Sequence, residues 1–154
     1  MRSILIVKTS SMGDVVHALP AISDLSKAKP GIAIDWLVER SFSAIPARHA
    51  AVRHVIPLQW RKWRKSLFDG ATQQAMRECR QALRHEPYDL VLDLQGLLKS
   101  AAFACVASGP RAGFDRSSAR EPLASLFYGQ RFPVPRTLHA VDRCRRLTAQ
   151  AVGY

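Results

Sequence analysis

The sequence predicts an α/β fold built on an open, mainly parallel sheet with helices on both faces. Apolar runs of about four to eight residues alternate with longer segments in which apolar side chains recur at helical spacing. This alternation is typical of a parallel sheet, because each crossover between parallel strands usually contains a helix. The run at 88–92 is continuous and apolar, as expected for a central strand that is covered on both faces.

The first strand and helix are the clearest elements. Residues 3–7 are rich in β-branched side chains and predict a strand, which a polar loop at 9–13 follows. The next helix is expected to begin at Asp14 and to end before Pro30. Its apolar face consists of Val15, Val16, Leu19, Ile22 and Leu25. Because Pro20 lies in its second turn, we expect an early kink or a late start of this helix.

The remaining elements follow from the same periodicities. Further strands are expected at 32–38, 52–57 and 88–92. Further helices are expected at 42–48, 71–84, 97–106, 123–127 and 138–152. Apart from its short helix, the proline-containing segment 111–136 is expected to be irregular.

Composition limits the classes of protein to consider. The 154 residues are 47% hydrophobic and suit one globular domain with a core of its own. No apolar run approaches the roughly 20 residues that span a bilayer, and the N-terminal run is too short for a secretory signal, so we expect a cytoplasmic protein. The three cysteines are far apart and indicate neither a disulfide framework nor a zinc site.

The net charge of +11 indicates an anionic partner. Nucleic acid, anionic lipid and phosphorylated glycan all satisfy this condition, so charge alone leaves the three open. The five histidines show no spacing typical of metal ligands, and no motif of a covalent nucleophile is present.

The loop and helix start at Ser11, Met12, Gly13 and Asp14 form the first candidate site, because ligands of parallel sheets bind beyond the carboxyl ends of strands. The spacing matches neither a dinucleotide-binding loop nor a P-loop. Two interpretations of Asp14 remain open. It is a first-turn carboxylate that stabilises the helix, or a general base within reach of a substrate hydroxyl. Gly13 would let a ligand approach the backbone closely.

The segment Trp60–Lys65 places four cations and two indoles in six positions; the cations are Arg61, Lys62, Arg64 and Lys65. We expect the indoles to pack toward the body of the protein. The cations would then contact phosphates or carboxylates, with Arg as a planar fork and Lys as a point charge. Two alternatives remain open. The segment could stack on unpaired bases of single-stranded nucleic acid, or its cations could form only a solvated surface.

Two further segments carry polar groups. Asp93 and Gln95 follow the strand at 88–92 and could orient a polar ligand, with Lys99 one turn into the next helix. Simple capping of that helix is the alternative. Arg120 could complete an anion pocket, or only pair with Glu121.

These segments resemble, in order and spacing, those of glycosyltransferase family 9, the lipopolysaccharide heptosyltransferases. The similar stretches are ILIVKTSSMGDVVHALPAISD, IDWLVE, HAAVRHVIP with RKWRK, LVLDLQGLLKSA and AREPLASLFY. The family has two Rossmann-like domains in a GT-B arrangement and about twice this many residues. The resemblance therefore implies that residues 1–154 are the N-terminal, acceptor-binding domain, and that the C-terminal, donor-binding domain is absent from this chain.

The resemblance implies an inverting transfer of L-glycero-D-manno-heptose from ADP-heptose to Kdo2-lipid A at the cytoplasmic face of the inner membrane. Asp14 would be the catalytic base. The acceptor would be bound by Ser11, Met12, Gly13, Arg61, Lys62, Arg64, Lys65, Gln95, Lys99 and Arg120. No metal and no cofactor would be needed, and the chain alone would be inactive or nearly so.

Two alternatives differ in class from this enzyme. One is a basic α/β module that binds nucleic acid, although the sequence lacks an RNP, KH or helix-turn-helix signature and nucleic acid is not the expected partner. The other is a domain that dimerises through an apolar surface.

Overall fold

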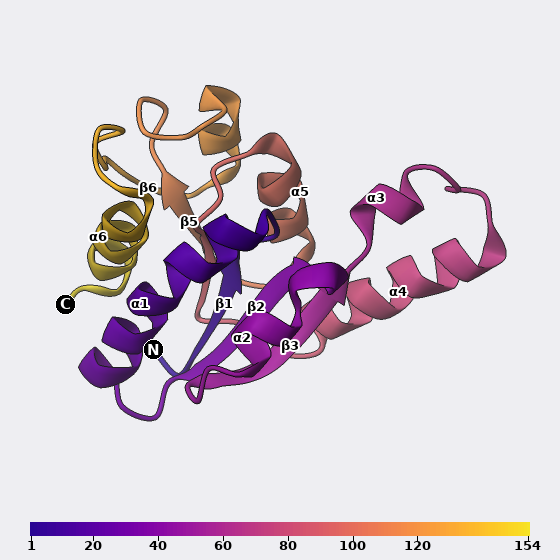
Figure 1. Cartoon of the computed structure of the whole chain (residues 1–154), viewed down its shortest axis with the longest axis horizontal. Coiled ribbons are helices and arrows are strands. Elements are labelled where there is room, and N and C mark those ends of the chain that lie inside the picture. The colour runs from indigo at the N-terminus through magenta and orange to yellow at the C-terminus, as the bar shows by residue number, and fades with distance from the viewer.

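Six parallel strands form one sheet in the order β3-β2-β1-β4-β5-β6 (Figure 1). The computed structural model describes all residues, 1–154. The strands are β1 (Ser3–Val7), β2 (Ala33–Glu39), β3 (Val52–Leu58), β4 (Leu90–Asp93), β5 (Arg111–Phe114) and β6 (Gln130–Phe132). This order confirms a Rossmann-like open sheet, in which the chain starts at the centre and winds outward in both directions.

Helices connect the strands and cover both faces of the sheet. The α-helices are α1 (Met12–Ala28), α2 (Ala44–Ala47), α3 (Trp60–Trp63), α4 (Gly70–Arg84), α5 (Leu98–Val106) and α6 (Ala140–Val152). The fold also contains two 3₁₀ helices, η1 (Arg40–Phe42) and η2 (Pro122–Phe127). None of these helices is both long and apolar enough to cross a membrane.

Alternate residues of β1 enter two separate cores. Ile4 and Ile6 belong to the larger core, which packs under α1 and α6. Leu5 and Val7 belong to the second core, which packs under α4 and α5. Successive side chains of a strand point to opposite faces, so a strand with a helix layer on each side must be apolar throughout. The continuous apolar run in the sequence reflects this double burial.

The segment predicted to be irregular, 111–136, contains β5 and β6, so that prediction is wrong. These strands have only four and three residues, and Arg111, Gly113 and Gln130 give them no apolar periodicity. They form because they extend the edge of an existing sheet. Ala112 and Phe114 are buried in the larger core, and tertiary contacts of this kind override weak local preference.

The start of α1 also differs from the prediction. The helix begins at Met12 rather than at Asp14, and it continues through Pro20. The predicted late start is therefore wrong. Proline removes a single backbone hydrogen bond, and the buried neighbours Ala18, Ala21 and Ile22 hold this stretch of helix against the sheet.

Most other boundaries agree with the prediction to within about two residues. The predicted helix at 42–48 is divided into η1 and α2. The short helix predicted at 123–127 is the 3₁₀ helix η2.

Candidate active site

The loops that follow β1 and β4 lie side by side at the carboxyl edge of the sheet, because these two strands are neighbours. Gln95, which is 2% exposed, joins them. Its Oε1 accepts from the backbone N–H of Thr9 at 3.1 Å, and its Nε2 donates to the carbonyl of Ser10 at 2.5 Å. Both ends of this amide therefore bind the neighbouring loop. Contact of Gln95 with an acceptor stays a prediction.

Asp14 lies in the first turn of α1, beside this junction. Its Oδ2 accepts from the backbone N–H of Ser11 at 3.3 Å, so it does stabilise the helix start. Arg120, which follows β5, also binds it at two points. Nη2 donates to Oδ1 at 2.8 Å and Nη1 donates to Oδ2 at 3.2 Å. The alternative pairing of Arg120 with Glu121 does not form, since Glu121 instead accepts from the N–H of Leu98 at 2.6 Å.

The cations around Asp14 keep its carboxyl group ionised. Partial burial alone would raise its pKa, but the hydrogen bonds from Arg120 and the charges of Lys8 and Arg120 outweigh burial and hold the pKa below its usual range. The side chain is 15% exposed. Asp14 is therefore a carboxylate at neutral pH that a hydroxyl group can approach.

Lys8 is a site residue that the sequence did not single out. Its side chain is buried, and its Nζ donates to the carbonyl of Leu94 at 2.8 Å. Burial lowers its pKa, while the nearby carboxyl groups of Asp14 and Asp93 oppose this. A lysine directly after an apolar strand was the available signal, because a side chain at such a position points either into the core or toward the carboxyl edge.

Arg143 of α6 was also missed. Its guanidinium lies 4.7 Å from the centre of the Phe114 ring and donates to the carbonyl of Ser118, and its buried Nε has no partner. With Lys8 and Arg120 it lines a cavity of about 10 Å³, enough for about one water. No local pattern marks Arg143, since the sequence of α6 has only the periodicity of an amphipathic helix.

Asp93 organises the second loop from within the core. It is fully buried and accepts from the N–H groups of Gln95 and Gly96 at 2.7 and 3.2 Å, and from the hydroxyls of Ser100 and Tyr128 at 2.7 and 2.6 Å. Burial raises its pKa, and these four hydrogen bonds oppose that effect. All its contacts are internal, which fits the interpretation that Asp93 shapes the loop rather than contacts a ligand.

The basic segment, residues 61–65, has the expected arrangement. Trp63 is buried in the second core, and Trp60 packs edge-on against Phe103 with ring centres 5.8 Å apart. The two indoles therefore pack toward the body, as predicted. The four cations (Arg61, Lys62, Arg64 and Lys65) are exposed and form no ion pair.

Glu39, the last residue of β2, lies near both Arg61 of this segment and Lys99. Its side chain is 7% exposed, and its Oε1 has no hydrogen-bond partner. Burial raises its pKa, and the charges of Lys99 and Arg61 oppose this. Lys99 and the basic segment therefore lie near the same end of the sheet. No hydrogen bond or ion pair joins either to Asp14.

Ser11, Met12 and Gly13 are exposed on the first turn of α1. A Cβ placed on Gly13 would meet no atom within 4 Å, so the space beside this turn is open. Gly13 directly precedes Asp14 in this turn, so no protein atom near Gly13 would obstruct a ligand there. No group of three His, Cys, Asp or Glu side chains in the structure could hold a metal ion.

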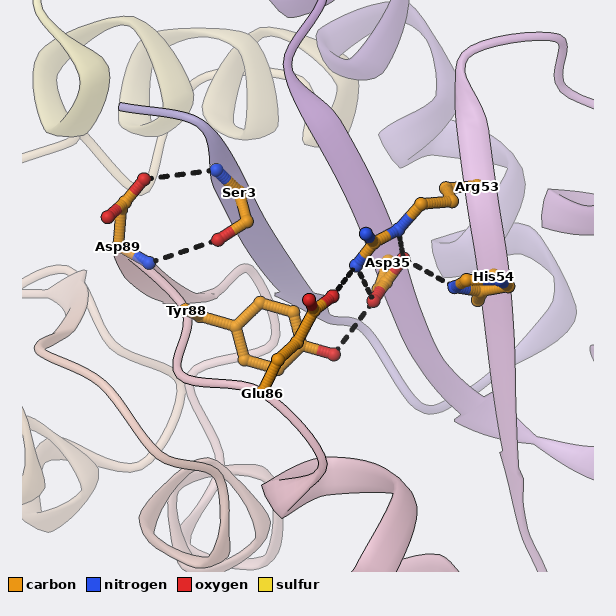
Figure 2. Close-up of polar contacts among 7 residues, drawn as sticks. All are labelled: Ser3, Asp35, Arg53, His54, Glu86, Tyr88 and Asp89. Atoms are coloured by element: carbon orange, nitrogen blue, oxygen red, sulfur yellow. Dashed lines mark hydrogen bonds and ion pairs between the residues drawn. The ribbon is translucent and has the colours of Figure 1, made fainter.

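A second polar cluster lies near the amino ends of the strands (Figure 2). Asp35 accepts two hydrogen bonds from Arg53 at 2.9 and 2.8 Å and one from the Tyr88 hydroxyl at 2.8 Å, while Glu86 pairs with the same arginine. These residues line part of a cavity of about 850 Å³ between β3 and α4. Because its charged groups pair with one another and ligands of such sheets bind at the carboxyl ends, we assign the cluster a structural role.

Comparison with known proteins gives matches over nearly the whole chain. The sequence model of glycosyltransferase family 9 (heptosyltransferase) matches residues 76–154. Lipopolysaccharide heptosyltransferase 1 of Escherichia coli K12 is 51% identical over 98% of this chain and 48% of its own length. The protein of the same name from Pseudomonas aeruginosa is 53% identical over 98% of this chain and 43% of its own length. The chain thus spans about half the length of these relatives.

Solved structures agree. The E. coli heptosyltransferase WaaC with ADP superimposes on all of this chain with a TM-score of 0.96 and 48% identity, and the match covers 48% of that protein. A family 9 glycosyltransferase from Veillonella parvula, at 17% identity and a TM-score of 0.78, shares the fold over 97% of this chain and 41% of its own. The sequence, the fold and the family match all agree: this chain belongs to glycosyltransferase family 9, the heptosyltransferases.

Proposed function

We propose that this chain is the acceptor-binding half of a GT-B heptosyltransferase, which transfers L-glycero-D-manno-heptose from ADP-heptose to Kdo2-lipid A with inversion. The observation that carries the proposal is the ionised Asp14 carboxylate, held at the carboxyl edge of the sheet beside Lys8 and Arg120. A base surrounded by cations suits an acceptor that brings both a hydroxyl group and anionic groups. The relatives support the same reaction, since WaaC was solved with ADP and with ADP-2-deoxy-2-fluoro heptose.

Asp14 would act as the general base. Its carboxylate takes the proton of the attacking Kdo hydroxyl while the oxygen forms its bond to the anomeric carbon of heptose. The bond from that carbon to the diphosphate breaks on the opposite face, and ADP leaves with the electron pair. One direct displacement accounts for the inversion and needs no covalent intermediate on the protein.

Arg120 would set the strength of that base. While it is paired with Asp14, it stabilises the carboxylate and weakens its affinity for a proton. An acceptor carboxylate or phosphate can draw the 42% exposed guanidinium toward itself. The pKa of Asp14 would then rise, and the base would become stronger only when the acceptor is bound.

The basic segment and Lys99 would bind the remaining anionic groups of the acceptor. The four cations of the segment have no partner within the chain, so an anion does not have to displace one. Binding of the ADP group would rest mainly on residues outside this chain. An acceptor embedded in the inner membrane would also place the protein at the cytoplasmic surface of that membrane.

Equilibrium binding of deacylated Kdo2-lipid A to this chain, across a salt series, tests the proposal. A single-stranded oligonucleotide serves as the competitor. We expect saturable binding that weakens with salt and that the oligonucleotide barely displaces. Tight oligonucleotide binding without an acceptor signal would instead identify a nucleic-acid module, whose affinity falls steeply with salt.

A further inference from the structure

The loop between α3 and α4 presents two apolar side chains to solvent at one end of the molecule. In Figure 1 this loop forms the extreme right of the ribbon, beyond the edge strand β3. Phe68 is 93% exposed, and the adjacent Leu67 is 45% exposed. Single exposed apolar residues are common, but an aromatic ring with almost no protein contact gains nothing from folding. Its exposure therefore points to a partner outside the chain.

The loop is anchored on both sides of this apolar tip, Leu67 and Phe68. On one side Trp63 is buried in the second core. On the other, the Asp69 carboxylate accepts from the backbone N–H of Thr72 at 3.3 Å and caps α4. The hydroxyls of Ser66 and Thr72 lie 3.1 Å apart and close the loop. The tip is thus presented outward by an anchored turn.

The charges next to the tip identify the partner. Arg61, Lys62, Arg64 and Lys65 precede it and are all exposed. The one acidic residue between positions 60 and 70, Asp69, is occupied in capping α4. An exposed aromatic and an aliphatic side chain beside four cations match the interface of an anionic bilayer, where apolar groups enter between headgroups and cations contact lipid phosphates.

We propose that Leu67 and Phe68 insert into the interfacial region of an anionic phospholipid bilayer, with the basic segment on the surrounding phosphates. This inference rests on the proposed function, because it gives the enzyme a contact with the membrane that holds its acceptor. It adds a role for two residues that have none in acceptor chemistry. Apolar insertion and charge attraction are two separate contributions, and together they give more durable membrane binding than either alone.

Sedimentation of the chain with vesicles tests the proposal. The vesicles contain phosphatidylcholine with about one third phosphatidylglycerol, or phosphatidylcholine alone. We expect binding to the anionic vesicles only, and Phe68→Ser should weaken it about tenfold, the scale expected for losing one inserted aromatic side chain. Leu126→Ser is the matched control, since Leu126 is 63% exposed on η2. It should leave vesicle binding unchanged.

A spectroscopic variant reports insertion directly. Phe68→Trp should retain vesicle binding, and its added emission should shift to the blue and be quenched by brominated lipids. Because residue 68 has almost no protein contacts, both variants should keep the circular dichroism of the parent. Unchanged vesicle binding in Phe68→Ser, an equal loss in Leu126→Ser, or added emission in Phe68→Trp that brominated lipids leave unquenched would each overturn the proposal.

The same variants separate this proposal from the proposed function. Binding of deacylated Kdo2-lipid A, which has no acyl chains, should be the same for the parent and for Phe68→Ser. If the parent failed to bind that oligosaccharide while Phe68→Ser still lost vesicle binding, the proposed acceptor would be wrong and the membrane contact would stand. If oligosaccharide bound and vesicle binding did not depend on residue 68, the reverse would hold.

Discussion

Arg120 donates hydrogen bonds to both carboxylate oxygens of Asp14, at 2.8 and 3.2 Å, although the two residues are 106 positions apart in the chain. The contact forms because α1 follows β1 and Arg120 follows β5, and both strands end at the same edge of the sheet. A carboxylate paired with an arginine is a weak base, because the positive charge lowers its pKa. Under the proposed mechanism, the pair would link acceptor binding to proton transfer.

Replacing the base should abolish most turnover. In a full-length enzyme that carries these residues, Asp14→Asn should lower kcat by at least ~10²-fold and leave acceptor affinity nearly unchanged, because a lost general base affects mainly the chemical step. Steady-state kinetics with ADP-heptose measure it. The matched control is Asp24→Asn, also on α1 and also paired with an arginine, Arg145, which should retain normal kcat. Near-normal turnover of Asp14→Asn would remove Asp14 from the mechanism.

Removing Arg120 should raise the pKa of Asp14. In Arg120→Ala the burial effect remains while the largest opposing contribution is lost, so the pKa should move up toward or above the ordinary value of about 3.9. A carboxyl NMR titration of the chain measures it. Arg116→Ala is the control, because Arg116 is exposed and forms no ion pair. An Asp14 pKa that stays low without Arg120 would show that Lys8 and the backbone N–H of Ser11 are enough to hold it down.

The same pair predicts an acid dependence of stability. The folded-state pKa of Asp14 lies below its unfolded value, so its contribution is fully present above about pH 4 and is lost as the pH falls through the folded pKa. Arg120→Ala should therefore lose less stability than the parent between pH 4 and the lower folded pKa. Urea unfolding at several pH values checks it, and parallel curves for the two proteins would contradict it.

The basic segment should govern how acceptor binding depends on salt. Arg61→Gln combined with Arg64→Gln should weaken binding of deacylated Kdo2-lipid A about tenfold at low salt and reduce the decrease in affinity as salt is added. Titration calorimetry at three salt concentrations measures both. The control removes two exposed cations of α4, Arg77→Gln with Arg80→Gln. Equal losses in the two double variants would mean that only net charge matters.

Gly113 is required by the ring of Tyr128. A Cβ at position 113 would come within 2.4 Å of that ring, whose hydroxyl donates to the buried Asp93. Gly113→Ala should cost about 2–4 kcal/mol of unfolding free energy, because it displaces the ring and weakens a buried hydrogen bond. Thermal and urea unfolding measure the loss. Gly13→Ala, in open space on α1, should be neutral or slightly stabilising, and a cost there as large as at Gly113 would contradict the steric explanation.

Much of the fold could be predicted because its strongest elements carry their own periodicity. β1 to β4 and the long helices have apolar patterns that local burial dictates, and their positions agree with the prediction to within about two residues. β5 and β6 have no such pattern. Position 113 is a glycine against which the Tyr128 ring packs, and Arg131 of β6 is exposed to solvent. Short edge strands depend on the sheet that they join, and this information lies elsewhere in the chain.

The candidate site divides in the same way. Asp14, Gln95 and Arg120 are each marked by a strand end or by a family motif, so the sequence could name them. It could not show that Arg120 binds Asp14, or that the Gln95 amide forms hydrogen bonds with the backbone of Thr9 and Ser10. Lys8 and Arg143 were missed for a related reason. A cation becomes a site residue through its neighbours in space, and no local spacing records them.

The α/β class, the basic character and the positions of the chemical groups were all predictable from the sequence, because periodicity, charge and motif spacing are properties of neighbouring residues. Which of these groups meet is visible only in the folded chain. The strand order brings Asp14 to Arg120. In the same folded chain the basic segment has no ion-pair partner and Phe68 lies in solvent. Those pairings follow from which strands lie side by side, which depends on the packing of the whole chain.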